Sequence, residues 1–409
     1  MARAPATGGS GRRGRRVIGA EHVSEAHQRG RVVIEVLPGD IVTAQARESA
    51  ERLKIRLVDG PLEKPAVVRT DGATAMRRTL YRRSPKWVAP RPQHTRNARR
   101  VRRLALVGAG GVGANIGHLA ANADIADEIV LIDIAPGMAA SVALDLNHAS
   151  GVSRSRSRAT GGTELSRVAG AEVIVVTAGR PRTPGMTRAD LLDINRRIVR
   201  QAGEAIRAHA PDAIVIVVTN PLDEMTVEML QATGFPRERV LGMAGTLDSS
   251  RFRNALALAA GVPVSDVEAI TLGSHGDEMA PITSRARIRG RHLDRFLSPD
   301  QIAACVKDAV TGGGQVVALR KTGSAVLAPA HASIELIDHI RGARAGAVPA
   351  SVMLRGEYGI EGVVLGVPCH LGASGLVEVE ELDLSEAELA ALRAAADAIR
   401  ARLGGAATG

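Results

Sequence analysis

A glycine-rich segment follows the apolar run LALV, and its spacing is that of a phosphate-binding turn. Gly108, Gly110 and Gly113 stand in the order Gly-x-Gly-x-x-Gly, between a strand-like run and a segment of helical periodicity. Glycine allows a tight turn and a close approach of the helix N-terminus to a pyrophosphate. Asp133 closes the next apolar run, where a carboxylate can accept hydrogen bonds from an adenosine ribose. The pattern predicts an NAD site, since this carboxylate would repel the 2′-phosphate of NADP.

Alternating strands and helices must position these groups. Short β-branched runs separated by helical segments follow residue 100, among them DEIVLID, AEVIVVTAG and AIVIVVTN. This alternation favours an α/β fold with a Rossmann-type doubly wound parallel sheet. From about residue 248 the pattern mixes strands and helices, which predicts a second domain of the α+β class. We therefore expect a Rossmann domain at 101–247 and an α+β domain at 248–409.

Four further motifs stand downstream of the glycine turn, in the order TAGRPRTPGMTRADLL (177–192), VTNPLDEMT (218–226), GMAGTLDSSRFR (242–253) and LGSHGDEMAP (272–281). With them, residues 101–404 resemble the lactate/malate dehydrogenase family. The resemblance implies an NAD-dependent oxidoreductase that acts on malate, and it makes 248–409 the substrate-binding, catalytic domain. It also implies a homodimer or homotetramer. No metal-ligand spacing accompanies the motifs, and hydride chemistry requires no metal.

The resemblance assigns the proton chemistry to His275, whose ordinary pKa lies near working pH. By the family pattern, Asp248 accepts a hydrogen bond from the other ring nitrogen, which fixes the tautomer and favours the imidazolium formed when malate is oxidised. Arg251, one helical turn further on, would present its planar guanidinium to the C1 carboxylate. Without the motifs, His275 would be interpreted as a loop residue, Asp248 as a helix N-cap and Arg251 as part of a solvated helix face.

Two arginines lie in segment 178–190, whose glycines and prolines suit a lid that closes over the site. Arg188 matches the family position that polarises the substrate carbonyl. Arg182 matches the position that selects the substrate, which is Gln in members acting on lactate and Arg in those acting on malate. A buried guanidinium without a second carboxylate is costly, so the resemblance implies a dicarboxylic substrate and rejection of pyruvate by about 10⁴.

Further cofactor contacts implied by the resemblance lie near strand ends. Asn220 matches the residue that contacts both the nicotinamide ribose and the substrate. Val218 and Thr219 would provide backbone contacts to NAD, and Asn195, in LLDIN, matches another NAD contact.

The formal net charge of +10 is concentrated in the first hundred residues. Residues 1–100 hold 22 Lys/Arg against 9 Asp/Glu, whereas the remainder holds 31 against 34. Such an asymmetry predicts a basic N-terminal extension and linker joined to an enzyme of different composition. Aromatic residues make up 1% of the chain, so platforms for base stacking are scarce and specific nucleic-acid recognition is disfavoured.

Cysteine use and hydropathy bear on location. Cys305 and Cys369 are too few for a disulfide framework or a zinc site and fit a reducing cytosol. No apolar run has the length of a membrane span, and the N-terminus lacks the apolar region of a secretory signal. The sequence therefore predicts a cytoplasmic protein without a membrane partner, and the family resemblance implies a bacterial enzyme.

The extension itself has internal structure. Residues 1–30 are Gly/Arg-rich and predict disorder, because they offer little to bury. A strand at 31–38, a helix capped by Thr43 and a strand at 54–60 predict a small βαβ-like unit. The Pro/Arg-rich stretch 61–100 predicts a linker.

A second, distant resemblance concerns IVTAQARESAERLKIRL (41–57), which is similar to a short segment found in several proteins of bacterial microcompartments. It implies that residues 31–60 direct the enzyme to a microcompartment shell, cargo or lumen. The alternative is a solvated basic tail with a small accessory fold.

Two other functions stay open at the level of sequence. Thr183 and Thr187 depart from the commonest family pattern PRKPGMSR around the selecting arginine, so lactate or another 2-hydroxy acid is the alternative substrate. The surplus of positive charge would alternatively make the chain a binding protein for nucleic acid or a protein shell, with dehydrogenase activity secondary.

Overall fold

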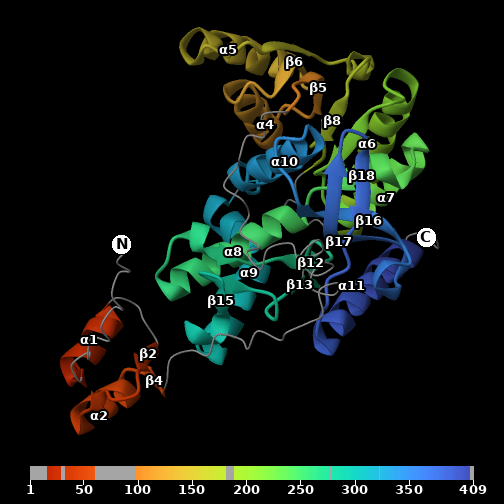
Figure 1. The fold of residues 1–409 in the computed structure, drawn as a ribbon. Coiled ribbons are helices and arrows are strands. Elements are labelled where there is room, and N and C mark those ends of the chain that lie inside the picture. The colour runs from red at the N-terminus through yellow and green to blue at the C-terminus, as the bar shows by residue number, and fades with distance from the viewer. Residues whose placement is uncertain are drawn as a thin grey trace, which may run out of the picture.

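A computed structural model describes residues 16–28, 33–59, 98–180, 188–276, 278–321 and 323–405. Figure 1 shows a large body formed by the chain from residue 98 onward and a small N-terminal unit beside it. The body carries every predicted site residue that falls within these ranges.

One sheet runs through the large body in the order β13-β12-β17-β16-β10-β9-β8-β5-β6-β7, with β18 on β17. The parallel strands are β5 (Val101–Val107), β6 (Ala126–Ile132), β7 (Arg158–Gly162), β8 (Val173–Val176), β9 (Ile214–Val217) and β10 (Val240–Gly242). Numbered along the chain, these six strands have the spatial order 3-2-1-4-5-6 of a Rossmann sheet. The predicted fold class is therefore confirmed.

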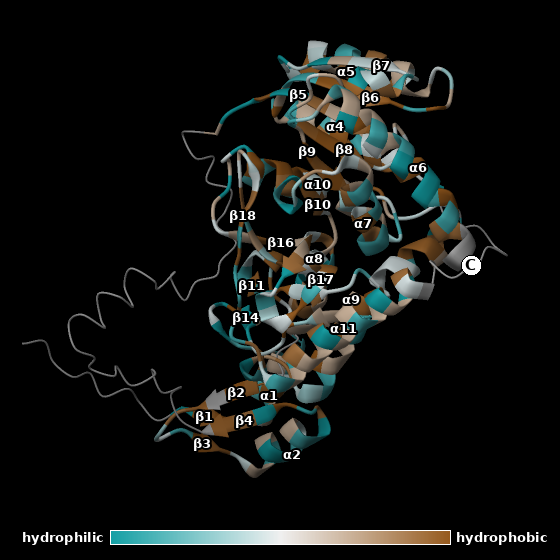
Figure 2. Cartoon of the chain, turned by 90° about the vertical axis from the view of Figure 1, so that its right-hand side faces the viewer, coloured by the Kyte–Doolittle hydropathy of each residue, from teal (hydrophilic) through white to brown (hydrophobic). Residues whose placement is uncertain are grey.

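Helices cover both faces of this parallel sheet, which is why β8 and β9 are buried at every position and consist of Val and Ile. Alternate residues of β5 enter different cores: Leu104 and Leu106 join one cluster, Ala105 and Val107 the other. Figure 2 shows the hydrophobic strands enclosed by helices with hydrophilic outer faces. The covering helices are α4 (Gly111–Asn122), α5 (Met138–Ser153) and α10 (Leu327–Ile340) for the first cluster and α6 (Arg188–His209) and α7 (Leu222–Thr233) for the second.

The second half of the body extends the same sheet with antiparallel strands. They are β12 (Thr271–Gly273), β13 (Met279–Pro281), β16 (Ala347–Arg355), β17 (Glu361–Gly372) and β18 (Gly375–Val379). A separate small sheet holds β11 (Val267–Glu268), β14 (Arg287–Ile288) and β15 (Arg291–His292). The remaining helices are α8 (Gly245–Ala260), α9 (Pro299–Arg320) and α11 (Glu386–Gly405).

One boundary bears on the sequence predictions. Since α8 begins at Gly245, the division placed between residues 247 and 248 falls in the first turn of this helix, and that division remains a prediction. The chain nevertheless changes at this point from parallel to antiparallel strands, because β16 pairs antiparallel with β10.

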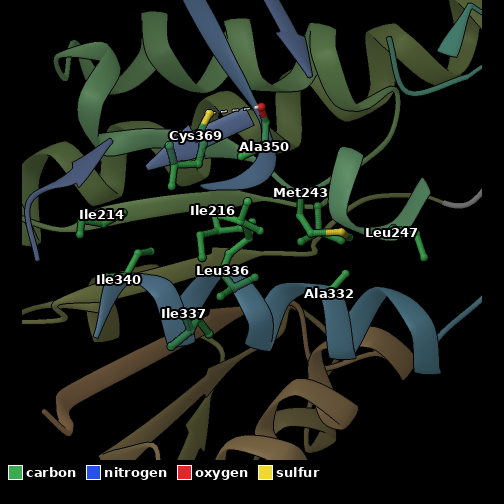
Figure 3. Close-up of a cluster of buried hydrophobic side chains, with 14 of the residues drawn as sticks. Ile214, Ile216, Met243, Leu247, Ala332, Leu336, Ile337, Ile340, Ala350 and Cys369 are labelled. Atoms are coloured by element: carbon green, nitrogen blue, oxygen red, sulfur yellow. Dashed lines mark hydrogen bonds between the residues drawn. The ribbon is translucent and has the colours of Figure 1, made fainter. Parts of the chain in front are cut away.

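Helix α10 fills the interior between the two halves of the body. Figure 3 shows Leu336 and Ile340 of α10 beside Ile214 and Ile216 of β9. All four side chains are buried in the larger hydrophobic cluster. The core under the candidate site thus depends on residues more than a hundred positions apart in sequence.

The N-terminal unit contains two strand–helix–strand segments, β1 (Val17–Ile18), α1 (Ala20–Gln28) and β2 (Val33–Val36), then β3 (Ile41–Val42), α2 (Ala44–Arg52) and β4 (Arg56–Asp59). Parallel pairs join β1 to β3 and β2 to β4. The predicted βαβ-like unit corresponds to β2, α2 and β4, and Thr43 caps α2 by accepting a hydrogen bond from the N–H of Ala46 at 3.1 Å.

The prediction of disorder for residues 1–30 is wrong for 16–28. Ile18 and Val23 are fully buried against Ala46 and Ala50 of α2, so this stretch does have an apolar face to bury. The first fifteen residues, and the linker up to residue 97, lie outside the described residues.

One helix of the described ranges, α9, contains a window apolar enough to cross a membrane by length and composition alone. Helices of proteins that do not enter membranes pass the same test. Here α9 starts with a capping box at Ser298 and Gln301, and its buried side chains are Cys305 and Ala309, which lie in the same cluster as Phe252 of α8.

A pair of leucine truncations tests the role of α10. We expect Leu336→Ala to lower the free energy of unfolding by about 2–5 kcal/mol, because this fully buried side chain leaves a cavity. Leu319→Ala, at a leucine that is 84% exposed, should change it by less than about 0.5 kcal/mol. Urea unfolding measures both, and equal effects would contradict the described packing.

Candidate active site

The glycine turn lies where the strand order of the parallel sheet reverses, between β5 and β8. The N–H of Gly108 donates to the carbonyl of Ile132 at 2.7 Å, and the N–H groups of Thr177 and Ala178 both donate to the carbonyl of Val107 at 2.8 Å. These bonds hold the carboxyl ends of β5, β6 and β8 together. Ligands of open α/β sheets bind in the crevice at such a reversal point.

The three glycines of the turn meet different constraints. Gly108 has a φ of +107°, and a Cβ there would lie 2.5 Å from Oγ1 of Thr177. A Cβ on Gly113 would lie 1.9 Å from the carbonyl oxygen of Gly108, so these two glycines are required by the protein itself. A Cβ on Gly110 would meet nothing within 4 Å. Gly110 is also the N-cap of α4 and no side chain caps this helix, so the helix start is open toward an anionic ligand.

Asp133 follows β6 and binds the turn directly. Its carboxylate accepts from the N–H of Ala109 at 2.8 Å and from that of Ala135 at 3.0 Å. Sequence reasoning did not foresee that this residue fixes the glycine turn. Because a carboxylate has about four acceptor positions, Asp133 retains capacity for ribose hydroxyls. The turn, the open helix start and this carboxylate together fit a dinucleotide.

Asn195 and Thr219 connect the ends of β8 and β9. Asn195 is buried, its Oδ1 accepts from the N–H of Arg180 at 2.7 Å, and its Nδ2 donates to the carbonyl of Asn220 at 2.6 Å. The hydroxyl of Thr219 donates to the carbonyl of Ala178 at 2.7 Å. The N–H of Val218 donates to Val176 within the sheet at 2.8 Å. These three residues therefore hold the strand ends, whereas Asn220 is exposed at the rim.

His275 and Asp248 form the central pair of the site. His275 follows β12, and its Nδ1 lies 2.9 Å from Oδ2 of Asp248. Asp248 stands in the first turn of α8, since Ala244 is the N-cap, so the N-cap role expected from sequence alone is wrong. Burial acts to lower the pKa of His275, but the negative charges of Asp248 and Asp223 outweigh it and raise the pKa above its ordinary value. Among the described residues Nε2 has no partner.

Arg251 is the third member of this group. Its Nη1 donates to Oδ1 of Asp248 at 3.0 Å, so one carboxylate binds both the histidine and the arginine. The guanidinium lies against α9, where a Cβ on Gly313 would approach Nη2 to 3.3 Å. The run Gly312-Gly313-Gly314 is a sequence signal that α9 leaves room for the Arg251 side chain, and sequence reasoning missed it. Five donors on a guanidinium leave several for a substrate carboxylate.

Asp223 is a site residue that sequence reasoning missed. It lies in α7, three residues after Asn220, and is buried. Its carboxylate accepts from the backbone N–H of His275 at 2.8 Å. The only signal was a charged residue within VTNPLDEMT, on a helix that is buried at nearly every position.

The lid arginines remain predictions. Arg182 lies outside the described residues, and Arg188 is the first residue of α6, for which the structure fixes the backbone. Within the described ranges no group of three His, Cys, Asp or Glu could hold a metal ion.

Comparisons with known proteins concern the large body of the chain. Residues 102–242 match the family model for the lactate/malate dehydrogenase NAD binding domain, and residues 245–407 match the model for the alpha/beta C-terminal domain of that family. The malate dehydrogenase of Trichormus variabilis is 43% identical over 301 residues, covering 74% of this chain and 93% of that protein. Malate dehydrogenase 1 of Anaeromyxobacter dehalogenans is 42% identical over 301 residues, covering 73% and 96%.

Solved structures agree. The malate dehydrogenase of Cryptosporidium parvum superposes with a TM-score of 0.73 at 35% identity, covering 76% of this chain and all of that one. The lactate dehydrogenase of the same organism, complexed with lactic acid and nicotinamide adenine dinucleotide, gives 0.73 at 34% identity, covering 76% and 99%.

Two alanine substitutions separate the glycine roles. We expect Gly110→Ala to leave the melting temperature unchanged but weaken NADH binding by about tenfold or more, because the methyl group enters open space where a pyrophosphate would lie. Gly113→Ala should lower both the melting temperature and the affinity for NADH, since its Cβ collides with Gly108. Fluorescence titration of NADH and thermal unfolding measure the two effects. Unaltered NADH affinity in Gly110→Ala would place the cofactor elsewhere.

Proposed function

This chain belongs to the lactate/malate dehydrogenase family, and on that premise we propose that it is an NAD-dependent malate dehydrogenase. It would interconvert malate and NAD with oxaloacetate and NADH. The observation that carries the proposal is the group formed by Asp248, His275 and Arg251 in the same chain as a glycine turn suited to a dinucleotide.

The residues of the turn fit the cofactor. Gly108, Gly110 and Gly113 would let the pyrophosphate reach the start of α4, and Asp133 would accept from the adenosine ribose. Asn220, at the rim, would contact the nicotinamide ribose and the substrate. Asn195, Val218 and Thr219 would contact the cofactor as well as hold that rim in place. When bound, NAD supplies the acceptor for the hydride on C2 of malate.

The proton of the reaction is assigned to His275. In malate oxidation Nε2 would take the proton of the C2 hydroxyl, and in the reverse direction it would return this proton to the carbonyl oxygen. Asp248 holds Nδ1 at 2.9 Å, so the ring presents Nε2 and the imidazolium gains a direct counter-charge. Because the pKa of His275 is raised, the protonated form that would donate a proton to the carbonyl oxygen of oxaloacetate persists to higher pH.

Arginines would hold the substrate. Arg251, anchored by Asp248, would bind the C1 carboxylate through its remaining donors. Arg188 would polarise the carbonyl, and Arg182 would pair with the second carboxylate of a dicarboxylic acid. Support for Arg182 comes from the motif TAGRPRTPGMTR, and lactate or another 2-hydroxy acid is the competing substrate.

A single substitution tests the substrate class. For the unaltered chain we expect kcat/KM to be about 10⁴-fold higher for oxaloacetate than for pyruvate. For Arg182→Gln we expect this ratio to fall by a factor of at least about 10². NADH absorbance with oxaloacetate, pyruvate and longer 2-oxo acids gives the ratios, and Arg180→Gln is the matched control. Faster turnover of pyruvate by the unaltered chain would refute malate as the substrate.

We also propose that the enzyme is cytoplasmic and forms a homodimer or homotetramer. Apolar side chains exposed along α5, namely Met138, Leu144 and Val152, are the kind of surface that a second subunit would cover.

We further propose that residues 31–60 direct the enzyme to a microcompartment. The support for this proposal is that residues 16–28 and 33–59 form a unit with its own core, joined to the body by a hydrogen bond from Arg56 to the carbonyl of Asp294 at 2.5 Å.

Deletion of residues 1–97 tests the extension. Since the unit has a separate core, kcat/KM should stay within about twofold of the full chain, while co-sedimentation with microcompartment shells is lost. Heparin binding in parallel tests simple attraction to polyanions, and Arg56→Ala controls for the contact with the body. Loss of NADH oxidation on deletion would instead make the extension part of the catalytic fold. Full-length protein that does not co-sediment with shells would refute the proposed targeting role of the extension.

A further inference from the structure

His275 is held by two carboxylates, and the proposed mechanism uses one of them. Asp248 binds the imidazole ring, whereas Asp223, from α7, accepts from the backbone N–H of the same residue at 2.8 Å. The two aspartates come from different helices and approach His275 through different atoms. The position of the ring therefore depends on both.

The surroundings of Asp223 suit an ionised carboxylate. Besides the N–H of His275, its oxygens accept from the hydroxyls of Ser274 and Ser351, each at 3.0 Å. A backbone N–H can only donate, and the two hydroxyls supply two further donors. Asp223 and both serines are almost completely buried, so water does not compete for these bonds. Three donors around one buried carboxylate favour its charged form.

The C-terminal helix orients one of these donors. Arg402 of α11 donates from Nη2 to Oγ of Ser274 at 3.2 Å, and its other nitrogens donate to Glu224 at 2.7 Å and Glu278 at 2.8 Å. A guanidinium cannot accept a hydrogen bond, so Ser274 must accept from Arg402 and has its own hydrogen left for Asp223. The charge of Arg402 is meanwhile balanced by the two glutamates.

We propose that Asp223 is a second positioning carboxylate for the catalytic histidine, fixing the backbone of His275 and stabilising the imidazolium by its negative charge. The inference rests on the proposed function, in which His275 exchanges the C2 hydroxyl proton. Asp223 does not touch substrate or cofactor in this assignment. It acts through His275 alone.

The charged groups around Asp223 and His275 determine in which direction the pKa of His275 shifts when Asp223 is neutralised. Burial raises the pKa of Asp223 to about 6, while the hydrogen bond from His275 opposes this. The charged groups around Asp223 and His275 are Asp248 and Arg251 from α8, Glu224 from α7, Glu278 just before β13 and Arg402 from α11. Near pH 7 Asp223 is mostly charged and favours the imidazolium, and Arg251 disfavours it. Neutralising Asp223 should therefore make His275 lose its proton at lower pH.

The test uses Asp223→Asn, which keeps the shape and an acceptor oxygen for the N–H of His275 but removes the charge. We expect the acid limb of the kcat/KM profile for malate oxidation to move to lower pH by about one unit. At a pH on that limb, kcat/KM as a fraction of its plateau value should then rise about tenfold. Asp248→Asn provides the reference for loss of the direct partner. Asp397→Asn, at an exposed position on α11, is the matched control and should leave the profile in place.

A second readout does not require turnover. Diethyl pyrocarbonate modifies neutral imidazole, and peptide mass spectrometry reports the rate at His275 alone among the 11 histidines. The midpoint of this rate against pH should fall in Asp223→Asn by the same amount as the kinetic limb. This titration stays informative if malate proves not to be the substrate, so failure of the inference and failure of the proposed function give different results.

A folded Asp223→Asn protein whose His275 midpoint equals that of the unaltered chain would overturn the proposal and leave Asp223 a structural residue. Ser351→Ala provides an independent variant, because it removes one donor to Asp223 without touching His275. We expect a shift in the same direction but smaller. If Asp223→Asn does not fold, an unchanged midpoint in Ser351→Ala overturns the proposal.

Discussion

The hydrogen bond between Asp248 and His275 is the contact on which the proposed chemistry depends, and the fold must bring α8 and β12 close together to make it. Glycines permit this approach. A Cβ on Gly245, in the first turn of α8, would lie 2.7 Å from the side chain of Pro349, and Gly273, two residues before His275, has a φ of +89°. A larger residue at Gly245 would push α8 away from Pro349 of β16 and Thr271 of β12, whereas a larger residue at Gly273 would strain the backbone that leads to His275.

The continuous sheet explains how distant segments reach the same site. Gly242 of β10 is paired with Ser351 of β16, and a Cβ on Gly242 would lie 2.8 Å from the side chain of Ser351. This pairing sets the second half of the chain directly against the Rossmann strands and places a hydroxyl beside Asp223. Arg402 then closes the arrangement from the C-terminal helix. His275 is thus supported from four separate parts of the chain.

Sequence patterns predicted the elements well where the signal was local. The Val/Ile runs of β8 and β9, the glycine turn and the helix cap at Thr43 all depend on neighbouring residues, and each is found in the structure. Asp223 could not be predicted in the same way. Its partners His275 and Ser351 lie 52 and 128 positions away, and nothing near it in sequence indicates either contact. Motif matching named Asp248 and His275, but only the packed helices and strands show how they are held.

The most direct test of the account follows the hydrogen on C2 of malate. With malate deuterated at C2 and unlabelled NAD in ordinary water, hydride transfer predicts that the deuterium appears in NADH at one atom per turnover and that none enters the solvent. Mass spectrometry of the nucleotide measures this. Deuterium in the water would mean that the C2 hydrogen leaves as a proton. This result would contradict hydride transfer from C2, and with it the assignment of the hydroxyl proton to His275.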